Sequence, residues 1–349
     1  MKKSKLSAVF LTACMAATLL AGCGDKKTET TEATTEATTE ATTEAATTTE
    51  ATVADATASE AEDDENYETG DASLDNVRNQ DEIGDNELLV VSFGTSFNDS
   101  RRLTIGAIED KLDEEFGKDY SVRRGFTSQI IIDHVKRRDG IAIDNMAEAL
   151  DRAVDNGVKN LVIQPTHLMN GLEYTDVVNE VGDYADAFDQ VVIGDPLLTS
   201  DEDFDEVVKA ITDATAEYDD GETAICFMGH GTEADSNEVY QKMQDKLTDA
   251  GFENYFVGTV EATPSVDDVL AKVQAGDYKK VVLEPLMIVA GDHANNDMAG
   301  DDEDSWKSQF EASGAFDSVD CQIEGLGRID AVEQLYVAHT QAAIDSIAK

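Results

Sequence analysis

Two of the five histidines in this 349-residue chain stand in glycine-containing stretches that follow apolar runs. His230 lies in "FMGHGTE" and His293 lies in "VAGDHANND". Imidazole nitrogens bind divalent transition metals, and neutral histidine is available for this near pH 7. We therefore predict that His230 and His293 bind a metal ion.

A carboxylate lies between these two histidines at a regular interval. Glu261, in "VGTVE", follows His230 by 31 residues and precedes His293 by 32 residues. Because a strand–helix unit takes about 30 residues, residues at this interval on successive strand ends return to the same edge of a parallel sheet. Two histidines and one carboxylate are a known ligand set for a metal with an open coordination position. The spacing therefore predicts that the three side chains converge on one ion.

Each of these residues also has an ordinary structural alternative. A histidine at a strand end can hydrogen-bond a neighbouring loop, and Glu261 can cap a helix that begins near Thr263. Asp292 and Asp297 can cap a helix in "DDEDSWKSQF". The shared spacing, with a glycine close to each histidine, favours a metal site over separate structural roles.

Eight apolar runs alternate with amphipathic stretches after residue 86, which indicates parallel sheets covered by helices on both faces. "VVSFGTS" in the first four runs parallels "CFMGHGT" in the last four, and "VIQPTHLMNG" parallels "VLEPLMIVAG". The sequence therefore predicts two similar units of four strands. The expected strands are 87–94, 120–127, 160–168, 190–198, 223–231, 254–261, 280–289 and 318–327.

The predicted fold class is α/β, with two similar Rossmann-like lobes that each contain a parallel sheet. We expect an N-terminal lobe over residues 87–218 and a C-terminal lobe, with the metal site, over 219–349. The last helix, at about 329–347, can cross back over the first lobe. Because ligands of open α/β sheets bind beyond the carboxyl ends of the strands, we expect the binding site in a cleft between the lobes.

Residues 1–23 have the pattern of a lipoprotein signal peptide. Three lysines precede an apolar run, Leu6 to Ala21, that is too short to span a bilayer comfortably. The run leads into "LLAGC", which resembles a bacterial lipobox, so Cys23 is the expected lipidation site. The alternative is an ordinary signal peptide with a chance cysteine. The lipoprotein interpretation predicts a chain outside the cytoplasm, anchored to the cell membrane through Cys23.

Residues 24–86 have the composition of a disordered acidic linker. They repeat Thr-Thr-Glu-Ala and contain 19 acidic residues against three basic ones. Such a segment buries too little apolar surface to offset its chain entropy, so we predict a stalk. The net charge of −48 for the whole chain argues against nucleic-acid binding, which depends on clustered lysine and arginine. It does not oppose the binding of cations.

Two cysteines remain beyond the signal and the expected lipidation site. Cys226 and Cys321 both lie in expected strands. Two buried free thiols are the simpler interpretation, and a disulfide between them stays open.

Several of these motifs also occur together in a known family. "SFGTS", "FTSQIII", "MGHGTE", "VGTVE", "EPLMIVAGDHANNDMAG" and "DSWK" resemble the anaerobic sirohydrochlorin cobaltochelatase family, one of the class II tetrapyrrole chelatases that include ferrochelatase. The resemblance implies the chelatase fold, with a tetrapyrrole between two Rossmann-like lobes. It also implies insertion of Co²⁺, the substrate metal, into sirohydrochlorin or precorrin-2 in anaerobic cobalamin biosynthesis, with other divalent ions as alternatives.

The same resemblance assigns roles to individual residues. It makes His230, Glu261 and His293 the metal ligands, and His230 the group that accepts a proton from the tetrapyrrole. His167, at the end of an expected first-lobe strand, either contacts the macrocycle or has a structural role.

Sirohydrochlorin carries eight carboxylates, and the chain offers a few clustered basic residues that can bind them. Arg123, Arg124 and the stretch "VKRRD" at 135–139 are the candidates, although a solvated helix end is the ordinary interpretation of that stretch. His134 and His339 are expected on helices without a functional role.

An export signal does not fit the cytoplasmic synthesis of cobalamin precursors, so the sequence leaves a second function open. This alternative is a surface lipoprotein that binds metal, haem or a corrinoid for uptake without catalysis. The three predicted ligands favour the enzyme, because capture of haem does not need a base paired with a carboxylate.

Overall fold

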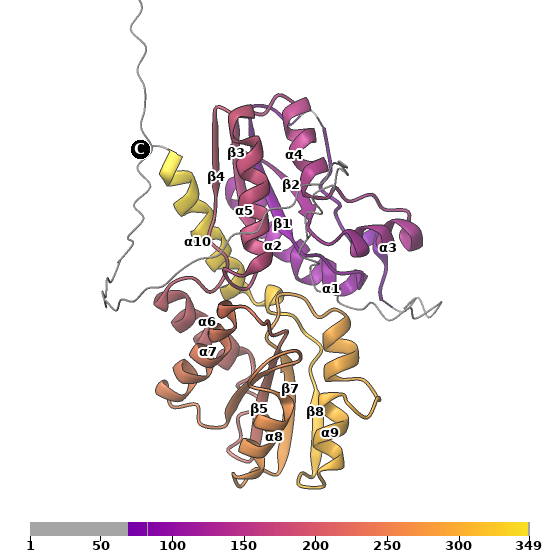
Figure 1. The fold of residues 1–349 in the computed structure, drawn as a ribbon, viewed down its shortest axis with the longest axis vertical. Coiled ribbons are helices and arrows are strands. Elements are labelled where there is room, and N and C mark those ends of the chain that lie inside the picture. The colour runs from indigo at the N-terminus through magenta and orange to yellow at the C-terminus, as the bar shows by residue number, and fades with distance from the viewer. Residues whose placement is uncertain (1–68, 82, 348–349) are drawn as a thin grey trace, which may run out of the picture. The chain divides into compact units, whose positions relative to one another are not determined.

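The computed structural model describes residues 69–81 and 83–347, which belong to one compact unit. Their core is two four-stranded sheets in which every pairing is parallel, so the predicted α/β class is confirmed (Figure 1). The first sheet, in the order β2-β1-β3-β4, contains β1 (Asn86–Ser92), β2 (Ser121–Phe126), β3 (Asn160–Pro165) and β4 (Gln190–Ile193). The second sheet, in the order β6-β5-β7-β8, contains β5 (Thr223–Gly229), β6 (Tyr255–Thr259), β7 (Lys280–Pro285) and β8 (Ser318–Cys321).

Ten α-helices connect and cover these strands in the described part of the chain. Three of them begin with a capping box. In this motif the side chain of the N-cap residue accepts from the backbone N–H group of the third helical residue, whose own side chain accepts from the backbone N–H group of the N-cap residue. The helices are α1 (Asn98–Leu103), α2 (Ile105–Phe116), α3 (Gln129–Asp139), α4 (Met146–Asp155), α5 (Leu172–Tyr184), α6 (Asp201–Ala214), α7 (Glu238–Asp249), α8 (Val266–Gln274), α9 (Trp306–Ala312) and α10 (Asp330–Ile347). None of the helices in the described residues is long and apolar enough to cross a membrane.

All eight expected strands occur, but each ends earlier than the apolar run that predicted it. Strand β7 ends at Pro285 although the run continues to Val289, and β3 ends at Pro165 although the run continues to Leu168. Proline has no backbone N–H group to donate to a sheet, which favours the end of a strand at this residue. The apolar residues beyond each proline therefore belong to the loops at the carboxyl edge.

The pairing registers show that the two sheets are copies of each other. Val91 pairs with Pro165 in the first sheet, and Met228 pairs with Pro285 in the second. Val91 is therefore equivalent to Met228, which aligns the following "SFGTS" with "GHGTE". The alignment of "VVSFGTS" with "CFMGHGT" that the sequence suggested pairs Val91 with Phe227 instead. It is therefore wrong by one residue.

Helix α10 leaves the second sheet and packs on the first, as the sequence indicated for 329–347 (Figure 1). It contacts α2, β3, β4 and α6. The Tyr336 hydroxyl is fully buried and donates to the backbone oxygen of Thr166 at 3.0 Å, with the oxygen of His167 at 3.3 Å. By its packing, this helix belongs to the first lobe, although 219–349 was expected to form the second.

The segment at the N-terminal end of the described residues corrects the predicted linker. Residues 69–81, which we call the strap, lie against the first lobe, with Thr69, Asp75 and Arg78 buried. The backbone oxygen of Arg78 accepts a hydrogen bond from the N–H group of Arg124 in β2. The linker expected over 24–86 therefore ends before residue 69. Its remainder, the signal peptide at 1–23 and Cys23 lie outside the described residues.

The cysteines and the first-lobe histidine have defined environments. Cys226 is buried, Cys321 is partly buried, and both are free thiols. His167 is only 8% exposed, and neither of its ring nitrogens has a hydrogen-bond partner among the described residues. Burial lowers the pKa of His167 to about 4 because it penalises the charged imidazolium.

His167 should therefore make the stability of the protein sensitive to acid. Its pKa in the folded state lies below the ordinary value of 6.5. The contribution of neutral His167 to the free energy of unfolding is therefore present above pH 6.5 and is lost as the pH falls towards 4. We expect the wild-type protein to lose roughly 3 kcal/mol more unfolding free energy than His167→Leu between pH 7 and pH 4. Urea unfolding of both proteins across this range measures the difference. If the free energy of unfolding falls equally with pH in both proteins, the prediction is wrong.

Candidate metal centre

Three neighbouring strands of the second sheet position the predicted ligands. His230 directly follows β5, Glu261 lies two residues after β6, and His293 follows β7 after a short loop. Because β5 lies between β6 and β7 and all three are parallel, their carboxyl ends meet at one edge. One ligand atom from each residue lies within 4.8 Å of those of the other two. The structure thus brings the three side chains close enough together to be candidates for holding one ion.

Both histidines present the same ring nitrogen to this point. Nδ1 of His230 lies 2.8 Å from the backbone oxygen of Gly231, and Nδ1 of His293 lies 2.7 Å from Oδ2 of Asp297. A carbonyl or carboxylate oxygen can only accept, so each Nδ1 carries the hydrogen, and in the neutral imidazole each Nε2 has a free lone pair. Nε2 of His230 lies 3.8 Å from Oε1 of Glu261, and the two imidazole rings have centroids 4.6 Å apart.

The backbone conformation after His230 requires a glycine at position 231. Gly231 has a φ of 90°, in the left-handed region, and a Cβ at this position would lie 2.8 Å from the backbone nitrogen of Ala262. The close approach lets the N–H group of Glu261 donate to the backbone oxygen of His230 at 2.9 Å. This bond ties the loop that carries Glu261 to the loop that carries His230.

Glu261, Asp292 and Asp297 do not cap helices α8 and α9, so the alternative interpretation of these acidic residues is wrong. Helix α8 is capped by Ser265, and α9 is capped by Ser305. The carboxylate of Asp297 binds His293 instead, and Oδ1 of Asp292 accepts from the Asn296 side chain.

Acidic side chains around His293 give the centre a negative potential. The hydrogen bond to Asp297 raises the pKa of His293, and the charges of Asp297, Asp292 and Glu261 act in the same direction. His230 and Glu261 are about half exposed, and His293 is about one-third exposed. A cation from solvent can therefore reach all three side chains.

The first lobe contributes a residue that the sequence analysis missed. Glu173 lies eight residues after Pro165, as His293 lies eight residues after Pro285, so the two occupy equivalent positions in the duplicated fold. Its Oε2 atom lies 3.7 Å from Nε2 of His167. Desolvation raises the pKa of Glu173, and the charge of His230 opposes that rise. Equal spacing from the two prolines was the signal that could have identified it.

The arginines that were candidates for binding an acidic ligand are engaged inside the protein. Arg123 is buried and pairs with Glu87 and Asp144, and Arg124 is buried between Asp75 and Glu109. Neither guanidinium is free for a ligand.

The stretch at 135–139 is only partly the solvated helix end that was expected. The side chain of Arg138 is 5% exposed and donates to the backbone oxygen of Ser96. Lys136 and Arg137 are exposed.

The sequence and the fold both have clear relatives. Residues 86–345 match the family model of the cobalt chelatase (CbiK). The chain is 37% identical over 258 residues to a sirohydrochlorin cobaltochelatase of Salmonella typhimurium, covering 74% of this chain and 96% of that protein. It is 28% identical over 284 residues to the sirohydrochlorin cobaltochelatase CbiKC of Nitratidesulfovibrio vulgaris, covering 79% of this chain and 97% of that protein.

A solved structure shares the fold. The structure of SirB from Bacillus subtilis with Fe³⁺ aligns with a TM-score of 0.56 at 14% identity, covering 76% of this chain and 98% of SirB. The family match includes β1 to β8 and all three side chains of the centre. The chain therefore belongs to the cobalt chelatase (CbiK) family.

Proposed function

We propose that this chain inserts Co²⁺ into sirohydrochlorin, the activity for which both relatives above are named. The observation that carries the proposal is the cluster of His230, Glu261 and His293 within the region that matches the family. In this proposal the ion is the metal substrate and the tetrapyrrole is the second substrate.

The second lobe would hold the ion before insertion. Removing water from a divalent ion is costly, so the protein must supply replacement ligands before the macrocycle does. The two free Nε2 atoms and the Glu261 carboxylate supply two neutral nitrogens and one negative oxygen, which suits Co²⁺. The carboxylates beside His293 add attraction for the cation.

His230 is the residue that we assign as general base. Insertion requires two pyrrole N–H protons to leave, and an imidazole is suited to accept a proton near neutral pH. The Nδ1–H group of His293 is held by a carboxylate, which makes its Nε2 the stronger metal ligand, whereas that of His230 is held by a neutral carbonyl. A lone pair that holds the ion cannot also hold a proton, so His230 would release the ion to the unprotonated ring nitrogens before it accepts the first pyrrole proton. Because His230 is about half exposed, it would pass that proton to solvent before it accepts the second. Glu261, 3.8 Å away, can then stabilise the resulting imidazolium.

Replacing the proposed ligands should abolish insertion without unfolding the protein. We expect His230→Ala and His293→Ala each to lower kcat/KM for cobalt insertion by roughly 100-fold or more, because each change removes a ligand and His230→Ala also removes the base. The absorbance change of sirohydrochlorin on metallation measures the rate against a metal-only control. His339→Ala, in α10, is the matched histidine control. Wild-type rates in both variants would place the chemistry elsewhere, and cobalt binding without insertion in the wild type would favour the capture alternative.

The first lobe would hold the macrocycle on apolar side chains. Phe93, Ile130 and Leu172 are 46%, 66% and 66% exposed and follow the carboxyl ends of β1, β2 and β3. Phe93 lies two residues after Val91, so it is the first-lobe equivalent of His230. A flat tetrapyrrole would cover these side chains, and burying such surface favours binding.

Two close approaches between loops bring this apolar surface next to the metal centre. A Cβ on Gly291, two residues before His293, would lie 3.2 Å from Oγ1 of Thr95, two residues after Phe93. A Cβ on Gly171 would lie 3.4 Å from Oγ of Ser236 in the second lobe. The loops that carry Phe93 and Leu172 therefore lie against loops of the second lobe.

Phe93→Ser should separate binding of the tetrapyrrole from binding of the metal. We expect KM for sirohydrochlorin to rise roughly 10-fold, because the change removes an apolar contact made only by the macrocycle. The affinity for Co²⁺ alone should stay unchanged. Steady-state kinetics and a cobalt titration measure the two quantities. The control is Val154→Ser, an exposed apolar residue on α4. An equal change of KM in both variants would contradict the assignment.

We also propose that the chain is attached to the cell membrane through Cys23, which rests on "LLAGC" alone. A radiolabelled fatty acid should be incorporated into the wild-type chain and carry it into the detergent phase. Cys23→Ser should abolish both, because the acceptor thiol is lost. A wild-type chain that stays unlabelled and in the aqueous phase would refute the anchor.

A further inference from the structure

The strap brings a buried negative charge from outside the region that matches the family. It covers residues 69–81, whereas the family match begins at residue 86. Oδ2 of Asp75 accepts from Nε of Arg101 at 2.7 Å and from Nη1 of Arg124 at 2.7 Å. Each of these three side chains is at most 1% exposed.

Arg101 depends on this carboxylate more than Arg124 does. Arg124 also binds Glu109 through two hydrogen bonds. In the part of the chain that the structure describes, Asp75 is the carboxylate that forms an ion pair with Arg101. A buried guanidinium without a counter-charge is strongly unfavourable, so the strap is what allows Arg101 to lie where it does.

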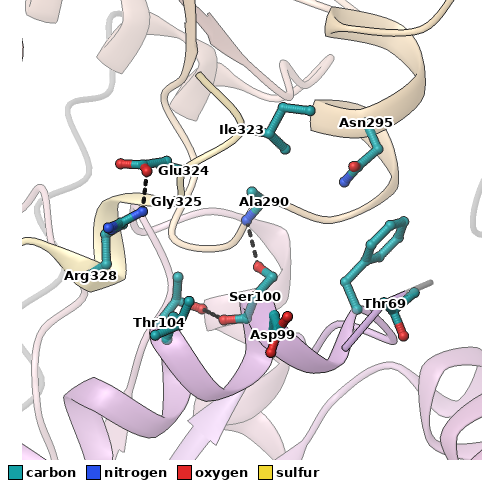
Figure 2. A pocket seen from close by; sticks show the side chains of 12 residues that line it. Thr69, Asp99, Ser100, Thr104, Ala290, Asn295, Ile323, Glu324, Gly325 and Arg328 are labelled. Carbon is teal, nitrogen blue, oxygen red and sulfur yellow. Dashed lines mark hydrogen bonds and ion pairs between the residues drawn. The ribbon is translucent and has the colours of Figure 1, made fainter. Parts of the chain in front are cut away.

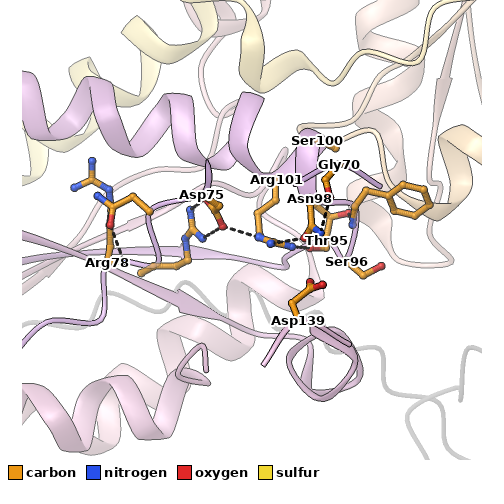
Figure 3. Close-up of polar contacts among 12 residues, drawn as sticks. Gly70, Asp75, Arg78, Thr95, Ser96, Asn98, Ser100, Arg101 and Asp139 are labelled. Carbon is orange, nitrogen blue, oxygen red and sulfur yellow. Dashed lines mark hydrogen bonds and ion pairs between the residues drawn. The ribbon is translucent and has the colours of Figure 1, made fainter. Parts of the chain in front are cut away.

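Arg101 in turn holds the loop between β1 and α1 (Figure 3). Its Nη1 donates to the backbone oxygen of Thr95 at 3.1 Å, and its Nη2 donates to Oδ1 of Asn98 at 2.6 Å. The strap contacts the same region directly, because the oxygen of Gly70 accepts from the side chain of Asn98 and the oxygen of Thr69 accepts from the N–H group of Asp99. The strap and Arg101 therefore position the start of α1 together.

Helix α1 contacts the loop that leads to His293 (Figure 2). Oγ of Ser100 accepts a hydrogen bond from the backbone N–H group of Ala290 at 3.0 Å. Ala290 lies between β7 and His293, three residues before that histidine. Thr69 of the strap, Ser100, Ala290 and Asn295 line one pocket of about 190 Å³. A continuous set of contacts thus connects Asp75 with the backbone that carries His293.

We propose that the strap is a positioning element for the metal centre, in which Asp75 acts through Arg101 and Ser100 on the loop that carries His293. This inference rests on the proposed function, since it assigns the strap a role in cobalt insertion. Neither Asp75 nor Ser100 is expected to touch the ion. Their effect is to hold Nε2 of His293 in place, as outer residues do around other metal ligands.

Asp75→Asn and Ser100→Ala, alone and combined in the full chain, test the connection. Each single change should lower kcat for cobalt insertion and the affinity for Co²⁺ roughly 10-fold, while KM for sirohydrochlorin stays unchanged. The double variant should be no worse than the more affected single variant, because both changes break the same connection. Amide hydrogen exchange over residues 289–295 should become faster in every one of these variants.

Two further variants complete the design. Gly70→Ala disturbs the strap without altering the buried charges, since Gly70 has a φ of 101° and a Cβ there would meet the side chain of Asp99. It should reproduce the defect even if Asp75→Asn does not fold. Asp71→Asn is the matched control and should leave activity unchanged, because among the described residues the Asp71 carboxylate binds Ser73 of the strap and neither buried arginine.

The outcomes separate this inference from the proposed function. A lower melting temperature with unchanged kcat and unchanged exchange over 289–295 would show a merely structural strap and overturn the inference. Additive effects in the double variant would overturn it as well. A wild-type chain that neither binds Co²⁺ nor inserts it would refute the proposed function, and the exchange data would still decide whether the strap positions the loop.

Discussion

Backbone pairing of β5 with β6 and β7 is the interaction on which the candidate site depends. The pairs Gly229–Thr259 and Met228–Pro285 fix where each strand ends relative to its neighbours. Because the hydrogen bonds of a parallel ladder set the register for the whole strand, the loops that follow start at one edge. Three side chains separated by more than 30 residues in the sequence thereby meet within 4.8 Å. A slip of one residue in either pairing would separate them.

Duplication of this sheet places different side chains at equivalent positions in the two lobes. The second lobe carries His230, Glu261 and His293 at positions where the first lobe carries Phe93, Ser128 and Glu173. One copy therefore presents two imidazoles and a carboxylate, and the other presents an apolar ring, a hydroxyl and a carboxylate. In the proposed function, the same backbone would bind a metal ion in one lobe and a macrocycle on the other.

Three arginines of this acidic chain are used inside the fold rather than at its surface. Arg101, Arg123 and Arg124 are fully buried, and each is paired with at least one buried carboxylate. Burial raises the pKa of Glu87 to about 7, an effect that its partner Arg123 opposes. Such pairs tolerate little change, because removal of one partner leaves the other charged and unsolvated. The strap is held by this kind of pairing, which is why its position is linked to that of α1.

Local sequence pattern determined the α/β class, the eight strands, the duplication and the convergence of His230, Glu261 and His293, because strand periodicity and the length of a strand–helix unit are local properties. The tertiary structure alone decided the strap and the burial of Arg123 and Arg124. Acidic composition predicted disorder up to residue 86, but the ion pairs of Asp75 reach Arg101 and Arg124 across 26 and 49 residues. Contacts over such separations depend on how the whole chain packs, and composition within a short window carries no information about the partner.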